Sequence, residues 1–389
     1  MSFELYSVRM VTYIYKEFKT AINKLKYPDS WFWARYTANP YSGCEHVCIY
    51  CDARSQRYYL TQNFEDEIII KDKFAKKLEA TIKNSRSLLR DVIGPGGICD
   101  AYQPVEKKVK NTRKLLKILM KFRFPVNLAT KSDLVTRDID LFKQIAKDTW
   151  CTIGFSVSTM DEEIASLLEP RSSPPQARMR ALKEIKQKAP EIQVGTYFMP
   201  IVPYLEDNYD QIEEVIKESK NAGAKFVLFA PGLTMRDVQQ EFFITKLRKS
   251  KYRDIVKPLL KLYGNNSEKN ELYKYLNQMN LKIYNLCQKY GLKTRVKRWI
   301  PSDYRKWNYI IAEVLLNEEY KNTILGSSNN KMKWAGLSIN NLDESIINYF
   351  KRGELKRLRN FSNEIIEFVK PYLKRGEKDR DKKTLDRFL

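Results

Sequence analysis

Three closely spaced cysteines constrain this chain more than any other feature of its sequence. The segment from Asn39 to Ser55 reads NPYSGCEHVCIYCDARS and places Cys44, Cys48 and Cys51 in the spacing C-x3-C-x2-C, so half of the six cysteines lie within eight residues. Thiolates are soft ligands that select zinc or iron–sulfur clusters over hard cations. A structural zinc site normally has four protein ligands, whereas a cubane cluster held by three cysteines leaves one iron open. The spacing therefore favours a cluster with an open coordination position.

Two alternatives remain open on the residues alone. His46, the only histidine of the chain, would have to serve as the fourth ligand of a zinc knuckle, although its position two residues after Cys44 is cramped for that role. The remaining cysteines, Cys99, Cys151 and Cys287, are distant in sequence and form no second C-x-x-C that would complete a zinc site. A surface redox disulfide is the other alternative.

The composition indicates a folded protein of the cell interior. The 389 residues are 43% hydrophobic and 30% charged, and no apolar run approaches the ~18 residues that span a bilayer. The N-terminal segment contains Glu4 and no small-residue cleavage site, so we expect no signal peptide. Six cysteines in so long a chain are not a disulfide framework, and a low-potential cluster suits a reducing compartment. We therefore expect a cytoplasmic protein that contacts no membrane.

Strand and helix patterns alternate as far as residue 235. Such alternation predicts parallel βα units, and we count about six, fewer than the eight of a full barrel. Gly223 is expected at the C′ position that ends the last helix of this series. The expected strands cover residues 31–40, 65–71, 98–102, 125–130, 150–158, 191–199 and 224–230, and the expected helices cover 72–89, 109–122, 141–147, 175–188 and 209–222.

The chain changes character near residue 235. Residues 1–30 form an N-terminal segment, 31–235 the βα core, and 236–389 a mostly helical extension whose end, residues 374–389, reads as a charged, frayed tail. The net charge of +23 divides into 36 Lys/Arg against 29 Asp/Glu (+7) up to residue 235, and 34 against 18 (+16) beyond it. This excess favours a nucleic-acid partner, although lysine-rich composition can also reflect the organism and maintain solubility.

The cysteine segment, with Tyr50 directly before the third cysteine, resembles the signature of the radical S-adenosylmethionine (radical SAM) superfamily. The longer run NPYSGCEHVCIYCDAR is similar to the spore photoproduct lyase-like subgroup, often called DNA repair photolyases. The blocks CDAYQPVEKKVKNTR, TKSDLVTRDIDLF and SVSTMDEEIASLLEPRSSPPQAR resemble the same subgroup and occur in the same order. The likeness therefore covers residues 31–235.

The resemblance implies an α/β fold, a partial (βα)6 TIM-like barrel, followed here by the mostly helical basic C-terminal extension. It implies a [4Fe–4S] cluster on Cys44, Cys48 and Cys51, whose open iron binds the amino and carboxylate groups of S-adenosylmethionine. Reduction of the cluster then cleaves this cofactor to a 5′-deoxyadenosyl radical, which abstracts a substrate hydrogen. A low-potential electron donor of the flavodoxin or ferredoxin type is implied as well.

The chemistry of a zwitterionic ligand indicates which residues would hold S-adenosylmethionine. Its amino group needs a nearby carboxylate, which Asp100 can supply at a strand end, and its carboxylate needs a fixed cation, for which Lys131 is well placed. Ser156 can hydrogen-bond either group or the ribose, and Tyr50 offers an apolar face to the adenine. The alternatives are a salt bridge between Asp100 and Lys131 and a plain strand hydroxyl at Ser156.

Two further groups of side chains have both a structural and a functional interpretation. Spore photoproduct lyases use a cysteine near the second strand as hydrogen donor to the product radical, and Cys99 lies in that neighbourhood. Free cysteine is also often a small buried hydrophobe, which is what we expect of Cys151 and Cys287. Glu169 and Arg171 either pair structurally, which we favour, or bind the ribose.

Within the basic extension, the stretch KTRVKRWIPSDYRKWNY at residues 293–309 interleaves cations with aromatic rings. Cations for phosphates and rings for stacking on bases are what binding to single strands or damaged duplexes requires. The alternative is a solvated helix whose aromatic residues pack on the barrel. The residues expected to bind nucleic acid are Arg295, Lys297, Arg298, Trp299, Arg305 and Trp307.

These observations lead to one favoured hypothesis and two alternatives. The favoured function is radical SAM chemistry on a nucleic-acid base, with repair of a pyrimidine lesion as one form of it. The first alternative is the same radical chemistry on a small molecule or peptide. The second alternative is a non-catalytic iron–sulfur or zinc protein that binds nucleic acid.

Overall fold

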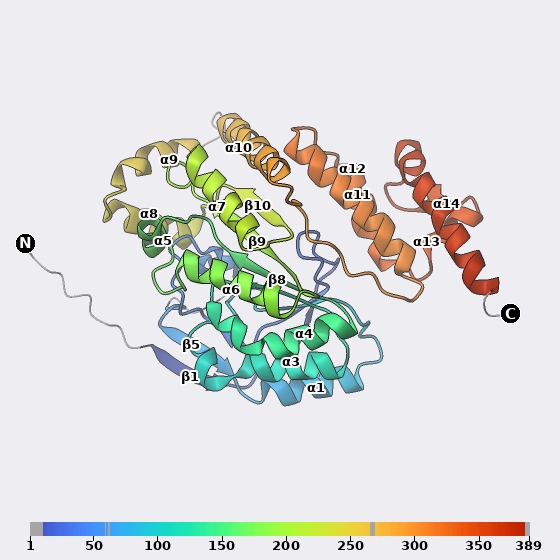
Figure 1. Ribbon diagram of the computed structural model, residues 1–389, viewed down its shortest axis with the longest axis horizontal. Coiled ribbons are helices and arrows are strands. Elements are labelled where there is room, and N and C mark those ends of the chain that lie inside the picture. The colour runs from blue at the N-terminus through green and yellow to red at the C-terminus, as the bar shows by residue number, and fades with distance from the viewer. Residues whose placement is uncertain (1–10, 59, 61–62, 265–268, 386–389) are drawn as a thin grey trace, which may run out of the picture. The chain divides into compact units, whose positions relative to one another are not determined.

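The computed structural model describes residues 11–58, 60, 63–264 and 269–385. The chain forms two compact units (Figure 1). The first consists of Met1–Lys24 and Tyr36–Val296, and the second of Leu25–Arg35 and Lys297–Leu389. The second unit therefore combines a short segment that interrupts the sequence of the first unit with the C-terminal part of the chain.

A seven-stranded sheet organises the described part of the first unit, in the order β10-β9-β8-β7-β6-β3-β2. Each neighbouring pair from β3 to β10 is parallel, and only β2 is antiparallel to its neighbour. This arrangement confirms the six parallel strands of the expected partial barrel. The strands are β2 (Asn23–Lys24), β3 (Tyr36–Ala38), β6 (Ile93–Pro95), β7 (Val126–Thr130), β8 (Cys151–Ser156), β9 (Gln193–Ile201) and β10 (Val227–Pro231).

The central strands are apolar because they are covered on both faces, as parallel strands with helical crossovers usually are. Nearly every residue of β7 and β8 is buried. Gly154 of β8 lies against the ring of Tyr197 on β9, where a Cβ atom would come within 2.2 Å of that ring. The Tyr197 hydroxyl donates to Asn127 Oδ1 of β7 at 2.8 Å. The glycine therefore makes room for a tyrosine that links β7 and β9 across β8.

The crossover helices follow the expected alternation (Figure 1). Asp161 caps α5 by accepting the N–H groups of Glu163 and Ile164, and this short helix was not expected from the sequence. Gly223, with φ of +90°, follows the last residues of α7, as predicted. The helices between strands are α1 (Phe74–Asn84), α2 (Glu106–Val109), α3 (Asn111–Lys121), α4 (Ile139–Asp148), α5 (Glu162–Leu168), α6 (Pro175–Lys188) and α7 (Tyr209–Asn221).

A separate three-stranded sheet, in the order β1-β5-β4, flanks the entry to the cysteine segment. It consists of β1 (Thr12–Lys16), β4 (Tyr41–Ser42) and β5 (Glu67–Lys71), with β5 parallel to β1 and antiparallel to β4. The strand expected at 65–71 is therefore present, but it belongs to this small sheet. The cysteine segment begins directly after β4.

Two expected strands were wrong in their extent. The strand predicted at 98–102 lies earlier, at β6, because Gly96 turns the chain with φ of +72° and the residues after it form turns. The strand predicted at 31–40 is reduced to β3. Before it, Asp29 Oδ1 accepts the N–H groups of Trp31 and Phe32 at 2.8 Å and forms a turn, and this stretch belongs to the second unit.

The change of character expected near residue 235 follows the end of β10, and the elements that the structure describes beyond it are helices. The first unit nevertheless continues to Val296. It includes α8 (Asp237–Arg248), α9 (Val256–Leu262) and α10 (Lys269–Lys289), and Lys293, after α10, pairs with Phe226 in a parallel bridge. The helical extension thus contributes both to the barrel unit and to the second unit.

The second unit is helical and has its own apolar core. Its helices are α11 (Lys306–Ile324), α12 (Asn330–Ser338), α13 (Ile346–Lys351) and α14 (Asn363–Leu385). The expected frayed tail is helical as far as Leu385, because Leu373 is fully buried and Gly376 lies against Trp307 and Ile347. Residues 386–389 lie outside the described residues. Within the described residues, no helix has the length and apolarity needed to cross a membrane.

Candidate active site

The cysteine loop is fixed at its start by a close backbone approach. Gly43 has φ of +84°, and a Cβ atom there would lie 2.6 Å from the carbonyl oxygen of Phe64 and 2.7 Å from that of Glu67. The Cys44 N–H donates to the same Phe64 carbonyl at 2.9 Å. Cys44 and Cys48 are buried and Cys51 is half-buried.

The loop is also pinned to the segment that follows β6. Glu45 Oε2 accepts the Val105 N–H at 2.6 Å, and the Glu45 N–H donates to Gln103 Oε1 at 3.0 Å. The Gln103 amide then donates to the carbonyl of Gly43 at 3.1 Å. The residues Gln103 to Val105 of the block CDAYQPVEKKVKNTR thus position the cysteine loop through these hydrogen bonds.

The three thiols lie near one another in a buried part of the loop and are suited to binding a metal centre. Burial raises the pKa of each, that of Cys48 to about 12, so the thiolates need a positive metal centre to form. In the described part of the chain, no three His, Cys, Asp or Glu side chains converge closely enough to hold one metal ion. A cubane takes one thiolate on each of three irons, so its ligands surround it and need not meet at one point.

Asp100 gathers hydrogen bonds at the carboxyl end of β7. Its carboxylate accepts the Thr130 hydroxyl at 2.9 Å, the Lys131 N–H at 2.7 Å and the Tyr102 N–H at 2.8 Å. His46 Nδ1 lies 3.5 Å from Asp100 Oδ2, and burial lowers the pKa of this imidazole. The side chain of Asp100 is therefore fixed beside the cysteine loop. The alternative of a salt bridge between Asp100 and Lys131 is not observed, because the Lys131 ammonium lies near Glu169 instead.

Glu169 is a buried carboxylate on another side of the cysteine loop, where Tyr50, Arg178 and Lys131 surround it. Tyr50 donates its hydroxyl to Glu169 Oε1, and Arg178 Nη2 lies 2.5 Å from Oε2. The ammonium of Lys131 is 3.9 Å from Oε1 and 5.7 Å from the centre of the Tyr50 ring. Burial alone would raise the pKa of Glu169, but Arg178, Lys131 and Tyr50 lower it on balance. Glu169 is therefore a buried anion in this structure.

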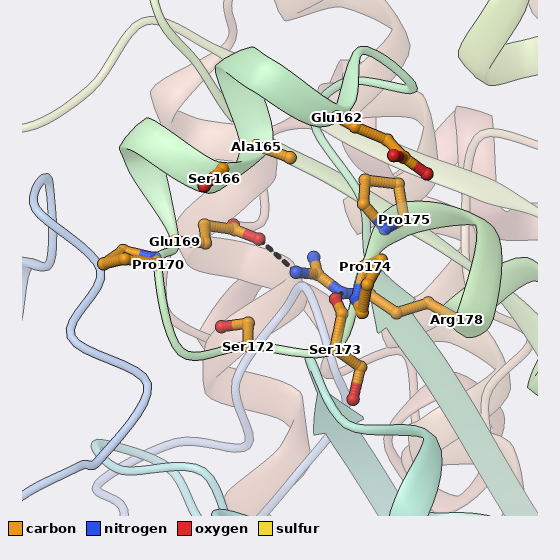
Figure 2. Close-up of a pocket in the computed structure, with 10 residues that line it drawn as sticks. All are labelled: Glu162, Ala165, Ser166, Glu169, Pro170, Ser172, Ser173, Pro174, Pro175 and Arg178. Carbon is orange, nitrogen blue, oxygen red and sulfur yellow. Dashed lines mark hydrogen bonds and ion pairs between the residues drawn. The ribbon is translucent and has the colours of Figure 1, made fainter.

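Arg178 carries the same network to the end of β8. It donates to the carbonyl oxygens of Ser156 and Ser173, both at 2.7 Å. Figure 2 shows the Glu169–Arg178 ion pair in the wall of a cavity of about 230 Å³ between α5 and the start of α6. The structural role favoured for Glu169 is thus present, but its partner is Arg178. Arg171 instead lies 3.6 Å from Asp66, which corrects the expected Glu169–Arg171 pair.

Glu206 is a site residue that sequence reasoning missed. It is fully buried after the carboxyl end of β9, and its Oε2 accepts the Val202 N–H at 2.8 Å. Burial, with a smaller contribution from the nearby Glu169 and Asp207 carboxylates, raises its pKa to about 8, although hydrogen bonds with Ser158 and the Val202 N–H lower it. The sequence YLEDNY around it looks like an ordinary polar loop, so only the fold reveals that this carboxylate lies near Tyr50 and Glu169.

Cys99 has the surroundings of a packed core thiol. It belongs to an apolar cluster with Tyr41, Cys44 and Ile70, and its thiol donates to the Tyr41 carbonyl at 3.1 Å. Burial raises its pKa to about 12. Its role as a hydrogen donor stays a prediction that this environment does not favour. Cys151 and Cys287 are buried, as expected.

The stretch expected to bind nucleic acid is largely internal to the second unit. Arg298 is 2% exposed, stacks 3.9 Å from the Tyr309 ring centre and donates to Asn340 at 2.5 Å. Arg305 is paired with Asp303, and Trp307 lies in the apolar core. These three side chains are buried by packing and cannot lie on a binding surface in this state. Lys297 is exposed, and Arg295 and Trp299 are half-buried.

A second cavity, of about 400 Å³, lies beside the cysteine loop, among the segments that follow β6, β7 and α5. His46 of the cysteine loop lines it, together with two exposed cations, Lys107 and Arg171, one exposed acid, Asp133, and the hydroxyl-bearing Ser132 and Ser173. The carboxyl ends of the strands are where barrel folds place their chemistry. This cavity therefore combines access to the cysteine loop with positive charge.

Comparison with known proteins agrees with this geometry. The model of the radical SAM superfamily matches residues 38–218. An uncharacterised protein of Methanocaldococcus jannaschii is 32% identical over 203 residues, which are 52% of this chain and 71% of that protein. The chain belongs to the radical SAM superfamily. An uncharacterised protein of Mycobacterium tuberculosis is 27% identical over 231 residues, covering 57% of this chain and 67% of its own length.

The radical SAM fold is also shared with a solved spore photoproduct lyase mutant, described with bound AdoMet and dinucleoside spore photoproduct. The two chains superpose with a TM-score of 0.50 at 13% identity, over 72% of this chain and 79% of the lyase. The protein is thus a radical SAM enzyme, and its cofactors are a [4Fe–4S] cluster and S-adenosylmethionine. The region that matches the superfamily model, residues 38–218, contains all of the predicted cluster ligands and S-adenosylmethionine-binding residues: Cys44, Cys48, Cys51, Tyr50, Asp100, Lys131 and Ser156.

Replacing Glu169 by glutamine should lower the free energy of unfolding by about 3–5 kcal/mol, because Arg178 would remain buried without its counter-charge. Urea denaturation of the cluster-free protein measures this loss. Glu162→Gln is the matched control, since Glu162 lies exposed on α5, and it should change stability by less than about 0.5 kcal/mol. Equal effects of the two substitutions would contradict the role assigned to Glu169.

Glu206 should make the enzyme less stable as the pH rises from about 4.5 to about 8. In this window the unfolded protein ionises Glu206, while the folded protein keeps it neutral because its pKa is raised to about 8. The free energy of unfolding should fall by about 1.4 kcal/mol per pH unit through this group.

Glu206→Gln removes the ionisation and keeps the shape of the side chain. Urea denaturation of cluster-free protein at pH 5.5 and 7.5 should show the variant gaining stability relative to the wild type at the higher pH. A difference between the two proteins that is the same at both pH values would refute the assignment.

Proposed function

We propose that this radical SAM enzyme abstracts hydrogen in a reaction on a nucleic-acid base, of the lyase or repair type. The observation that carries the proposal is the fold shared with a lyase whose solved structure holds a dinucleoside photoproduct. The net charge of +23 supports a polyanionic substrate. Radical chemistry on a small molecule or peptide is the competing function.

The cavity lined by His46, Lys107 and Arg171 supports the same proposal. Its volume of about 400 Å³ lies within the range of ligand pockets, and Lys107 and Arg171 supply cations at its lining. Phosphate groups are bound by such cations, and arginine is suited to bidentate contact. The cavity is therefore suited to a nucleotide unit presented beside the cysteine loop.

The residues of this chain have distinct tasks in the proposed reaction. Cys44, Cys48 and Cys51 are the predicted residues that would hold the cluster, and a bound cluster would supply the electron for reductive cleavage of S-adenosylmethionine. Asp100 is fixed by Thr130 and the Lys131 N–H, so it presents a preorganised carboxylate to an amino group. Burial alone would lower the pKa of Lys131, but Cys48 and Glu169 raise it on balance, so the ammonium stays charged for a carboxylate.

The proposal is tested by adding candidate substrates to the reconstituted enzyme with dithionite and S-adenosylmethionine. Oligonucleotides that carry ultraviolet photoproducts should accelerate formation of 5′-deoxyadenosine over undamaged DNA, and digestion followed by mass spectrometry should show a changed nucleoside. Binding should weaken as salt is raised, because phosphate contacts release counterions.

Cys48→Ala serves as the control, since it should form no 5′-deoxyadenosine with any substrate. If formation of 5′-deoxyadenosine in the wild type is indifferent to DNA and RNA, damaged or intact, the nucleic-acid proposal fails. A stimulation by small molecules or peptides alone would then support the competing function.

A further inference from the structure

A strongly basic surface of the first unit lies on α8, on α9 and on the turn between them. From residue 246 to residue 261 the chain has seven Lys/Arg and one acid, Asp254. All seven cations are exposed, and among them Lys251 pairs with Glu163 at 2.5 Å. We call this surface the α8–α9 basic face; it consists of Lys246, Arg248, Lys249, Lys251, Arg253, Lys257 and Lys261.

The opposite side of the same two helices packs directly on the cysteine loop. Phe243, Ile244 and Leu247 of α8 and Val256 and Leu259 of α9 share one apolar cluster with Cys48, Ile49 and Tyr50, against which Cys51 also packs. Figure 1 shows α8 and α9 beside α5, which contributes to this cluster. One layer of helix therefore separates the basic face from the cysteines.

Polar contacts fix the helices to the loop as well. The Gln239 side chain donates to the Tyr50 carbonyl at 3.0 Å, and Ser55 donates to Asp237 at 2.7 Å. The guanidinium of Arg236 lies 2.6 Å from Asp52. A partner bound on the basic face would thus sit against a rigid layer, about the 10 Å diameter of one helix from the cysteine loop.

This layer discriminates between two kinds of polyanionic partner. Hydrogen abstraction requires reacting atoms about 3–3.5 Å apart, so a nucleic acid bound on the basic face would be shielded from the chemistry by α8 and α9. An electron can cross one helix layer without such contact. The enzyme takes up one electron for each S-adenosylmethionine that it cleaves reductively, and a reduced donor protein loses that electron.

We propose that the α8–α9 basic face is the docking surface for a small acidic protein that carries a low-potential one-electron centre, an iron–sulfur cluster or a flavin. Charge complementarity steers such a partner to the face and orients its redox centre toward the cysteine loop. The inference rests on membership of the radical SAM superfamily and on this geometry, and it is independent of the substrate.

The test compares two triple variants of the full chain. Lys246→Glu, Lys249→Glu and Lys257→Glu reverse the basic face, while Lys76→Glu, Lys117→Glu and Lys183→Glu change the net charge equally on exposed positions of α1, α3 and α6. Binding of an acidic ferredoxin and of an acidic flavodoxin is measured by calorimetry, on cluster-free and cluster-loaded protein. Formation of 5′-deoxyadenosine is measured with each donor and with dithionite.

The face-reversed variant should bind at least one of the donors about tenfold more weakly or worse at low salt, and donor-driven formation of 5′-deoxyadenosine should fall in parallel. Dithionite-driven formation should match the wild type, which shows that the variant is folded. The control variant should keep most of the donor binding.

Three results would overturn the proposal. The first is equal donor binding by the two triple variants, and the second is no saturable binding of either donor to the wild type. The third is a face-reversed variant that loses binding of oligonucleotides while its donor binding is unchanged, which would assign the face to nucleic acid.

Discussion

The site depends on one buried anion. Glu169 is 5% exposed and is surrounded by the Tyr50 hydroxyl, the guanidinium of Arg178 and the ammonium of Lys131. These groups come from the cysteine loop, from α6 and from the end of β7. Burying one charge without its partners is costly, so the carboxylate forces the three elements into a single arrangement. This arrangement, together with the hydrogen bonds of Glu45 and Gln103, positions the cysteines.

The parts of the fold that the sequence predicted are those with local signals. Buried strands such as β7 and β8 read as apolar runs, crossover helices read as 3.6-residue patterns, and Gly223 marks a helix end. The cysteine spacing is equally local. The sequence prediction placed β6 too late because the residues after Gly96 are apolar. They are apolar because they are buried in turns, not because they form a strand.

What the sequence could not predict depends on contacts between distant residues. Nothing local distinguishes Arg178 from Arg171 as the partner of Glu169, or reveals that Glu206 is buried. The stretch at 293–309 has the composition of a nucleic-acid-binding surface, yet two of its arginines are buried. Arg298 packs on the Tyr309 ring and donates to Asn340, and Arg305 pairs with Asp303. The same residue types serve as buried structural groups in one unit and as the exposed α8–α9 basic face in the other.

The central claim is that a loop with three cysteine ligands leaves one iron free for S-adenosylmethionine. Electron paramagnetic resonance of the reduced, reconstituted enzyme, recorded before and after adding S-adenosylmethionine, tests it most directly. The account predicts the signal of a reduced [4Fe–4S] cluster whose g-values shift when S-adenosylmethionine is added. A cluster signal that S-adenosylmethionine leaves unchanged would contradict it.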